Sequence, residues 1–327
     1  MKKDKELEQR LRAWTEAAEA GDVSAMEALG AYYDELRPES MSSRERLGRW
    51  LGAAAKAGSV QAAFRLANAM AWGRSTPWLA GIDGTHEEVY LGLLRQAMEG
   101  GVPMATYTLA RKAAFPACFE LMGRAACQGV PDAVREVAMT LFDLGLVERS
   151  EPWLRRFIAM EEAAAQAGKS PYTQLVNRFV RLYGPDEDPG PFLPDPGALW
   201  RLGVCRERAG DIAEAVRLFR RVAAGEGLAN DGYVPLVPMP GNTGWEKPAR
   251  RMDAESFFGG AYDFKGETQA HLLWLAEQGL IESPDFSEDV LGRQGRWELE
   301  LLRHPERAKE RFPASVLACL ERLPEGR

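Results

Sequence analysis

Two stretches of matching sequence decide the fold of this chain. The first reads Trp14-Thr-Glu-Ala-Ala-Glu-Ala-Gly21-Asp22-Val-Ser-Ala25-Met-Glu-Ala-Leu29-Gly30-Ala-Tyr-Tyr33. The second reads Trp50-Leu-Gly-Ala-Ala-Ala-Lys-Ala-Gly58-Ser59-Val-Gln-Ala62-Ala-Phe-Arg-Leu66-Ala67. Equivalent residues lie 37 positions apart, as in Gly21 and Gly58, Ala25 and Ala62, and Leu29 and Leu66. A fixed period of this length is typical of tandem helical repeats.

Each stretch predicts a helical hairpin. Apolar residues recur at three- and four-residue spacing on both sides of the central glycine, which indicates two amphipathic helices. Gly21 suits the left-handed position that ends the first helix. The residue after the glycine, Asp22 or Ser59, is placed to cap the second helix. Small residues such as Ala25 and Gly30 are expected to let the two helices approach closely, although a glycine costs a helix about 1 kcal/mol relative to alanine.

Looser copies of the same pattern continue through the first two thirds of the chain. Their predicted turn glycines are Gly101, Gly129, Gly168 and Gly210. A single hairpin cannot bury both of its apolar faces, so neighbouring hairpins must stack. The sequence therefore predicts an all-α protein, an α-solenoid of stacked helix-turn-helix hairpins.

The repeated text resembles a known family. Trp14–Tyr33 is similar to the Sel1-like repeat, a relative of the tetratricopeptide repeat, at its Trp, Ala-Ala, Gly, Ala, Leu-Gly and Tyr positions. Leu199–Val222 is similar to a tetratricopeptide repeat. The resemblance covers roughly residues 10–225. It departs from the family after Tyr33, where the usual Gly-x-Gly-Val loop is replaced by residues 34–43, so long and variable loops between repeats are expected.

Composition shifts divide the chain into four predicted parts. They are Sel1-like helical repeats at 1–183, a Pro/Gly-rich loop at 184–197, a tetratricopeptide-like hairpin at 198–225, and an irregular loop followed by a divergent helical C-terminal cap at 226–327. Prolines fix φ and remove hydrogen-bond donors, so 184–197 is expected to be non-helical. Helices in the last part are expected at 268–279, 287–303 and 313–323.

Charge and composition favour some classes of protein over others. The chain is 46% hydrophobic and 27% charged, with a net charge of -7, which disfavours nucleic-acid binding. Its polar N-terminus lacks the apolar core of a signal peptide, and no stretch has the length of a membrane span. The cysteines (Cys118, Cys127, Cys205 and Cys319) are expected to be free thiols. A cytoplasmic location is expected.

Motifs that carry chemistry are sparse. The His-Glu-x-x-His and Cys-x-x-Cys signatures are missing, so neither a metal nor a cofactor is expected. Gly168-Lys-Ser170 resembles the end of a phosphate-binding loop but lacks the glycine required at position 163. The sequence favours a protein that is not an enzyme. The alternative is a hydrolase-type enzyme in the C-terminal third, with His271 paired to Asp263 or Asp285.

Aromatic residues in loops are the candidate partner-binding residues. Tryptophans in helical register, such as Trp50 and Trp153, are expected in the core. A loop aromatic residue either packs against the helices or is exposed as an anchor for a partner. The residues in question are Trp78, Phe192, Tyr233, Trp245, Phe257 and Phe258.

The leading functional hypothesis is a non-enzymatic protein-binding repeat protein. Stacked hairpins form an extended concave surface without needing catalytic residues. The resemblance to Sel1-like proteins implies a bacterial immunity protein or a secretion-system adaptor, whose partner is a single cognate toxin or effector. A signalling or regulatory scaffold is the alternative that the same resemblance allows.

Overall fold

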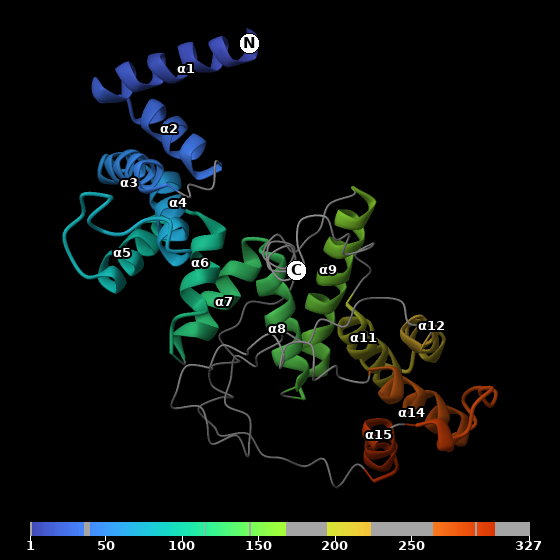
Figure 1. Cartoon of the computed structure of the whole chain (residues 1–327). Helices are drawn as coiled ribbons and strands as arrows, with labels where there is room; N and C mark the ends of the chain where they lie inside the picture. Colours follow the sequence, from blue (N-terminus) through green and yellow to red (C-terminus); the bar gives the residue numbers. More distant parts are fainter. Residues whose placement is uncertain are drawn as a thin grey trace. The chain divides into compact units, whose positions relative to one another are not determined.

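The structure, a computed structural model, describes residues 2–35, 40–114, 116–143, 145–167, 195–223, 264–291 and 293–304. Within these ranges the regular secondary structure is helical and contains no β-strand. The predicted all-α class is confirmed. The chain divides into two compact units, residues 1–113 and 114–327, which we call unit 1 and unit 2 (Figure 1).

Unit 1 is a succession of helices that pack in chain order. Each helix contacts the next one, and α2 also contacts α4. The helices are α1 (Lys2–Glu19), α2 (Val23–Glu35), α3 (Met41–Lys56), α4 (Val60–Ala71), α5 (His86–Glu99) and α6 (Pro103–Ala110).

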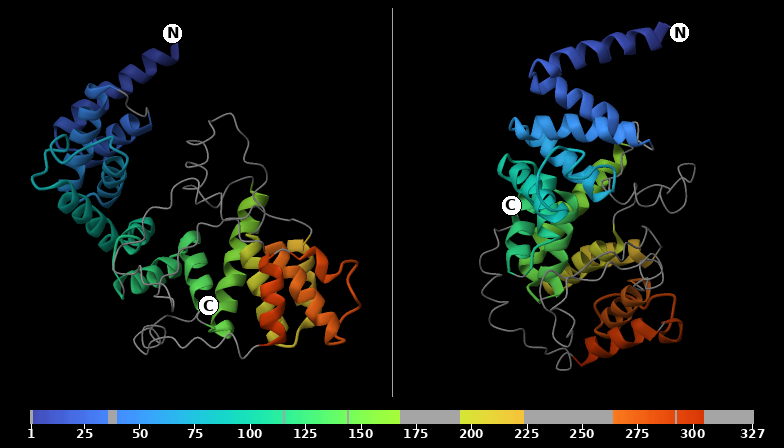
Figure 2. Two further views of the ribbon diagram at one scale, coloured as in Figure 1. Left: turned by 60° about the horizontal axis from the view of Figure 1, so that its bottom comes forward. Right: turned by 60° about the vertical axis from the view of Figure 1, so that its left-hand side comes forward.

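Unit 2 follows the same principle. Consecutive helices pack on one another, and α11 additionally contacts α8 and α14. Figure 2 shows α14 and α15, in orange and red, beside α11 and α12 in yellow. The helices are α7 (Ala117–Cys127), α8 (Pro131–Asp143), α9 (Val147–Gln166), α11 (Pro196–Arg208), α12 (Ile212–Ala223), α14 (Phe264–Glu277), the 3-10 turn η1 (Glu288–Val290) and α15 (Arg293–Arg303).

Left-handed glycines close the hairpins, as the sequence predicts. A positive φ is strained for residues with a Cβ but not for glycine. The φ angles are 97° at Gly21, 95° at Gly58, 85° at Gly101, 84° at Gly129 and 81° at Gly210. The predicted turn at Gly168 lies outside the described residues.

The predicted N-caps after these glycines are also confirmed. Oδ1 of Asp22 accepts a hydrogen bond from the backbone N–H of Ser24 at 2.8 Å. Oγ of Ser59 accepts from the N–H of Ala62 at 3.0 Å. Asp211 has the same role at the start of α12. Each cap satisfies a donor that the first turn of a helix leaves unpaired.

Small residues bring paired helices together. Ala25, Ala62, Ala105 and Ala133 are buried. A Cβ on Gly30 would overlap the side chain of Leu51, and a Cβ on Gly203 would overlap the ring of Phe219. The helix propensity lost at these glycines is therefore offset by close packing.

Ser40 caps α3: its Oγ accepts from the N–H of Ser43 at 3.2 Å. Two local predictions need correction. Helix α11 begins at Pro196, inside the stretch predicted to be non-helical, because proline is tolerated in the first turn of a helix. The predicted helix at 287–303 is interrupted, since η1 ends at an extended Leu291 before α15 begins. The helix predicted at 313–323 lies outside the described residues.

Among the helices of the described ranges, none combines the length and the apolar character that crossing a bilayer requires.

Candidate functional site

The loop between α4 and α5 lies directly on α3. Gly48 and Gly52 are four residues apart on α3 and therefore share one face. A Cβ at position 48 would lie 2.7 Å from the carbonyl oxygen of Leu79, and a Cβ at position 52 would overlap the carbonyl oxygen of Ala80. The two glycines therefore let the backbone of the loop touch the backbone of the helix.

Hydrogen bonds hold the middle of this loop in place. Lys56, which continues the Gly48–Gly52 face, donates from its ammonium to the carbonyl oxygen of Gly81. Within the loop, the N–H of Gly81 donates to the carbonyl of Trp78 at 3.0 Å, and the N–H of Ile82 donates to that of Pro77 at 2.9 Å. The middle of the loop is thus a set of tight turns fixed to α3.

Both ends of the loop are anchored as well. Arg74, just after α4, forms an ion pair with Asp34 of α2. At the other end Thr85 and Glu88 form a capping box, in which the N–H of Glu88 donates to Oγ1 of Thr85 at 3.3 Å and the N–H of Thr85 donates to Oε2 of Glu88 at 2.9 Å. A capping box satisfies two donors at the start of α5.

Trp78 is presented to solvent by this fixed loop. Its exposed fraction is 75%. Burying a tryptophan is strongly favourable, and exposed indoles are enriched among the residues that dominate binding energy. A fixed backbone favours binding further, because a preorganised anchor loses little conformational entropy when it binds.

The other sequence-predicted binding residues cannot be placed beside Trp78. Phe192, Tyr233, Trp245, Phe257 and Phe258 lie outside the described residues. The tryptophans in helical register behave differently from Trp78. Trp50 and Trp153 are buried, in agreement with their predicted core positions.

A second cluster of interest surrounds His271 in unit 2. Its Nδ1 lies 2.9 Å from Oε2 of Glu207 on α11, and its Nε2 lies 3.0 Å from Oε1 of Glu298 on α15. The imidazole is buried against the rings of Trp200 and Phe219, with centroids 5.7 Å and 5.2 Å away. His271 therefore links three helices of unit 2 through polar contacts inside an aromatic shell.

The two carboxylates determine the charge of His271. Burial lowers the pKa of the imidazole, but the hydrogen bonds to Glu207 and Glu298 outweigh this effect and raise the pKa to about 9. At neutral pH the ring is an imidazolium that donates from both nitrogens. An imidazolium engaged in this way has no lone pair left for a metal or for proton abstraction.

The pairing of His271 differs from the enzyme alternative that the sequence left open. Asp285 is exposed on the segment between α14 and α15, and the carboxylates on His271 are Glu207 and Glu298. Asp263 lies outside the described residues. The expected pairing with Asp285 is therefore wrong.

A buried ion pair fixes the start of α11. Nε of Arg135 donates to Oδ2 of Asp195 at 2.7 Å, and both side chains are almost fully buried. Oδ1 of Asp195 caps α11 by accepting from the N–H of Gly197 at 2.8 Å. The N–H of Asp195 donates to Oε2 of Glu161 at 2.8 Å. Asp195 therefore joins α8, α9 and α11, and its hydrogen bonds account for its burial.

Groups that hold metals or react as nucleophiles were sought in the described ranges. No cluster of three or more His, Cys, Asp or Glu residues there is arranged to hold a metal ion. Cys118, Cys127 and Cys205 are free thiols, as expected. Burial raises the pKa of Cys205 to about 12, which keeps its thiol protonated and unreactive.

Two comparisons with known proteins found no match for this chain. No protein-family model matches it. No curated protein is significantly similar to it.

The sequence offers Trp78 as a candidate binding residue but does not point to the residues that fix its loop. Gly48, Gly52 and Lys56 follow one another at four-residue spacing, which marks one face of a helix. Two glycines inside one predicted helix were the available signal, since such residues need a compensating close contact. The carboxylates around His271 carried no comparable signal.

Proposed function

We propose that this chain is a non-enzymatic protein-binding repeat protein in which Trp78 is an anchor for the partner. The observation that carries the proposal is the 75% exposure of Trp78 on a loop fixed to α3. Tryptophan is among the residues that most often dominate the binding energy of protein interfaces, and a fixed backbone limits the entropy lost on binding.

The hairpins supply the framework for this function. In the proposal they stack into an α-solenoid, and the loops between hairpins project from it. Support comes from the left-handed turn glycines and from the chain-order packing within each unit. Loops held on a rigid helical framework are common binding elements, because the framework fixes their geometry.

The catalytic alternative receives less support. It relied on His271, and both nitrogens of that ring are hydrogen-bonded to carboxylates in a buried position. These contacts account for His271 as a structural cation. We therefore keep the binding function and give the enzyme no role in the proposal.

A narrower form of the proposal concerns the partner. An immunity protein or a secretion-system adaptor in the cytoplasm has one dedicated partner, a toxin or an effector. That form rests on the resemblance of Trp14–Tyr33 to Sel1-like repeats. It requires a single stoichiometric complex rather than many weak ones.

Quantitative affinity capture from the native source tests the proposal. The full-length chain, its Trp78→Ala variant and a Met41→Ala control serve as baits, Met41 being an exposed apolar residue (55%) outside the loop. The expected result is one stoichiometric protein that the wild-type and Met41→Ala baits recover and the Trp78→Ala bait loses. Absence of any stoichiometric protein would overturn the binding function, and equal recovery by all three baits would overturn the role of Trp78.

A further inference from the structure

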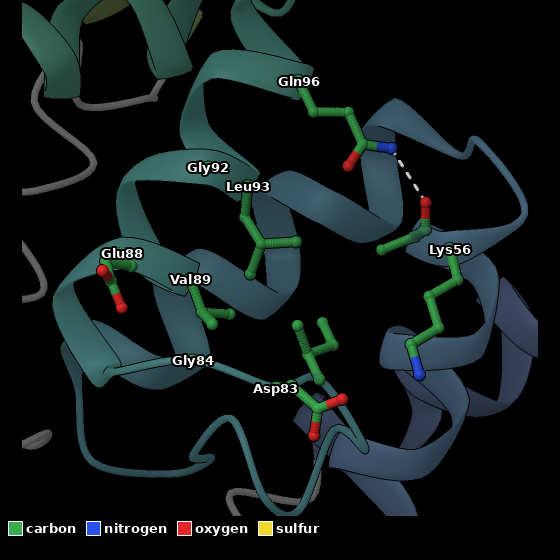
Figure 3. A pocket seen from close by; sticks show the side chains of 10 residues that line it. Lys56, Asp83, Gly84, Glu88, Val89, Gly92, Leu93 and Gln96 are labelled. Atoms are coloured by element: carbon green, nitrogen blue, oxygen red, sulfur yellow. Dashed lines mark hydrogen bonds between the residues drawn. The ribbon is translucent and has the colours of Figure 1, made fainter.

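A groove lies beside the α4–α5 loop within unit 1 (Figure 3). It is bounded by the end of α3, by residues 82–84 and by one face of α5, and its volume is about 510 Å³. Nε2 of Gln96 donates to the carbonyl oxygen of Ala55 at 2.8 Å and closes the groove between α5 and α3.

The floor of the groove is apolar. Figure 3 shows Val89 and Leu93 projecting from α5 into it. Ile82 of the loop and Ala55 of α3 complete the lining on the other side. An aliphatic side chain can therefore contact this floor, beside the polar groups that also line the groove.

Gly92 of α5 lines the groove without an internal reason to be glycine. A helix-interior glycine costs about 1 kcal/mol relative to alanine. At Gly30 and Gly52 this cost is explained, because a Cβ there would overlap a neighbouring residue. At Gly92 an added Cβ would meet no atom of the described residues within 4 Å. Close approach of another backbone from outside the chain would account for it.

The rim of the groove carries negative charge. Figure 3 shows Asp83 at the mouth of the groove, and no described residue forms a hydrogen bond or an ion pair with its carboxylate. Glu88 contacts Thr85 through Oε2, and the side-chain hydrogen bond from Thr85 lowers the pKa of Glu88. The cation of the groove, Lys56, already donates to the carbonyl of Gly81. An incoming basic group would therefore find two carboxylates at the rim.

We propose that this groove binds a segment of the partner protein that presents an aliphatic side chain next to a lysine or an arginine. The aliphatic side chain lies on Val89 and Leu93, the segment's backbone passes over Gly92, and the basic group pairs with Asp83. The inference rests on the proposed binding function and names the chemistry of the partner. It requires no part of unit 2.

Peptide selection tests the chemistry directly. The full-length chain is used to select binders from a phage-displayed library of short random peptides. Selected peptides are expected to share an aliphatic residue next to Lys or Arg. Enrichment of acidic peptides, or no enrichment over a blank surface, would overturn the inference.

Two variants locate the binding site of a synthetic peptide from this selection. Asp83→Asn removes the charge and is expected to weaken binding about tenfold, as loss of a charge-assisted hydrogen bond does. Glu16→Gln on α1 makes the same change in charge away from the groove and is expected to leave affinity unchanged. Equal effects of the two substitutions would contradict a specific role for Asp83.

A substitution at Gly92 distinguishes a loss of peptide binding from a loss of stability. Gly92→Leu fills the groove and is expected to abolish peptide binding, while the urea midpoint of the chain stays at or above that of the wild type. Arg95→Leu places a leucine elsewhere on the exposed part of α5 and is expected to retain binding. Undiminished peptide binding by Gly92→Leu would place the peptide elsewhere.

Failure of this inference is distinguishable from failure of the proposed function. If affinity capture recovers a partner whose binding tolerates Gly92→Leu and Asp83→Asn, the binding function stands and the groove is excluded. If capture recovers no partner, the proposed binding function is overturned, and the inference about the groove, which rests on it, is overturned as well.

Discussion

Gly52 of α3 and Ala80 of the α4–α5 loop touch backbone to backbone, so closely that a Cβ at position 52 would overlap the carbonyl oxygen of Ala80. This contact, repeated one turn earlier between Gly48 and Leu79, holds the loop that carries Trp78. The loop backbone that carries Trp78 is also fixed in its middle by Lys56 and at both ends by the Arg74–Asp34 ion pair and the Thr85–Glu88 capping box.

Gly52→Ala is expected to destabilise unit 1. The new Cβ improves helix propensity by about 1 kcal/mol but forces apart two backbones, and overpacking costs roughly 1–3 kcal/mol. Urea unfolding of the full-length chain measures the difference. Gly92→Ala is the matched control, since the same substitution enters open space and is expected to raise stability. Stabilisation by both substitutions would disprove the close contact.

The pH dependence of stability is expected to reflect His271. Its pKa rises from 6.5 to about 9 on folding, so its contribution is fully present below pH 6.5 and is lost as the pH rises through about 9. The contribution is roughly 3 kcal/mol. Unfolding free energies measured across this range for the wild type and for His271→Gln give the difference. A difference that does not change between the two ends of the range would show that His271 is not held as a cation.

Replacing only one partner of the ion pair between Arg135 and Asp195 is expected to lower the free energy of unfolding strongly. Arg135→Met leaves a buried carboxylate without its partner, which costs roughly 3–5 kcal/mol. Adding Asp195→Asn removes the buried charge and keeps a good N-cap for α11, so the double variant is expected to recover most of the loss. The urea midpoints of the wild type, Arg135→Met and the double variant measure both the loss and the recovery of stability. A double variant less stable than Arg135→Met would contradict this account.

The sequence predicts the hairpins well because their signals are local. Gly21 and Asp22 are adjacent, and the helices they separate follow directly, so a short window of sequence contains the whole turn. Trp78 stands out for the same reason, as a large apolar residue in a stretch of Pro and Gly. No knowledge of distant residues is needed for either prediction.

The remaining features depend on partners that are distant in the sequence. Glu207 is 64 residues from His271, and Glu298 is 27 residues from it. No spacing rule connects such positions, so the sequence does not distinguish these glutamates from Asp263 or Asp285 as partners of His271. The contact between Gly52 and Ala80 cannot be predicted from spacing either. The loop has no regular periodicity, so its position along α3 does not follow from the sequence.

The affinity of the captured partner for Trp78→Ala tests the central claim most directly. Titration calorimetry with the purified partner compares the wild type, Trp78→Ala and Met41→Ala, and the urea midpoints of the three chains establish that all are folded. The account predicts that Trp78→Ala weakens binding by a factor of about 30 or more, as loss of an interface anchor worth roughly 2 kcal/mol does, while Met41→Ala binds like the wild type. Equal affinity of Trp78→Ala and the wild type would contradict it.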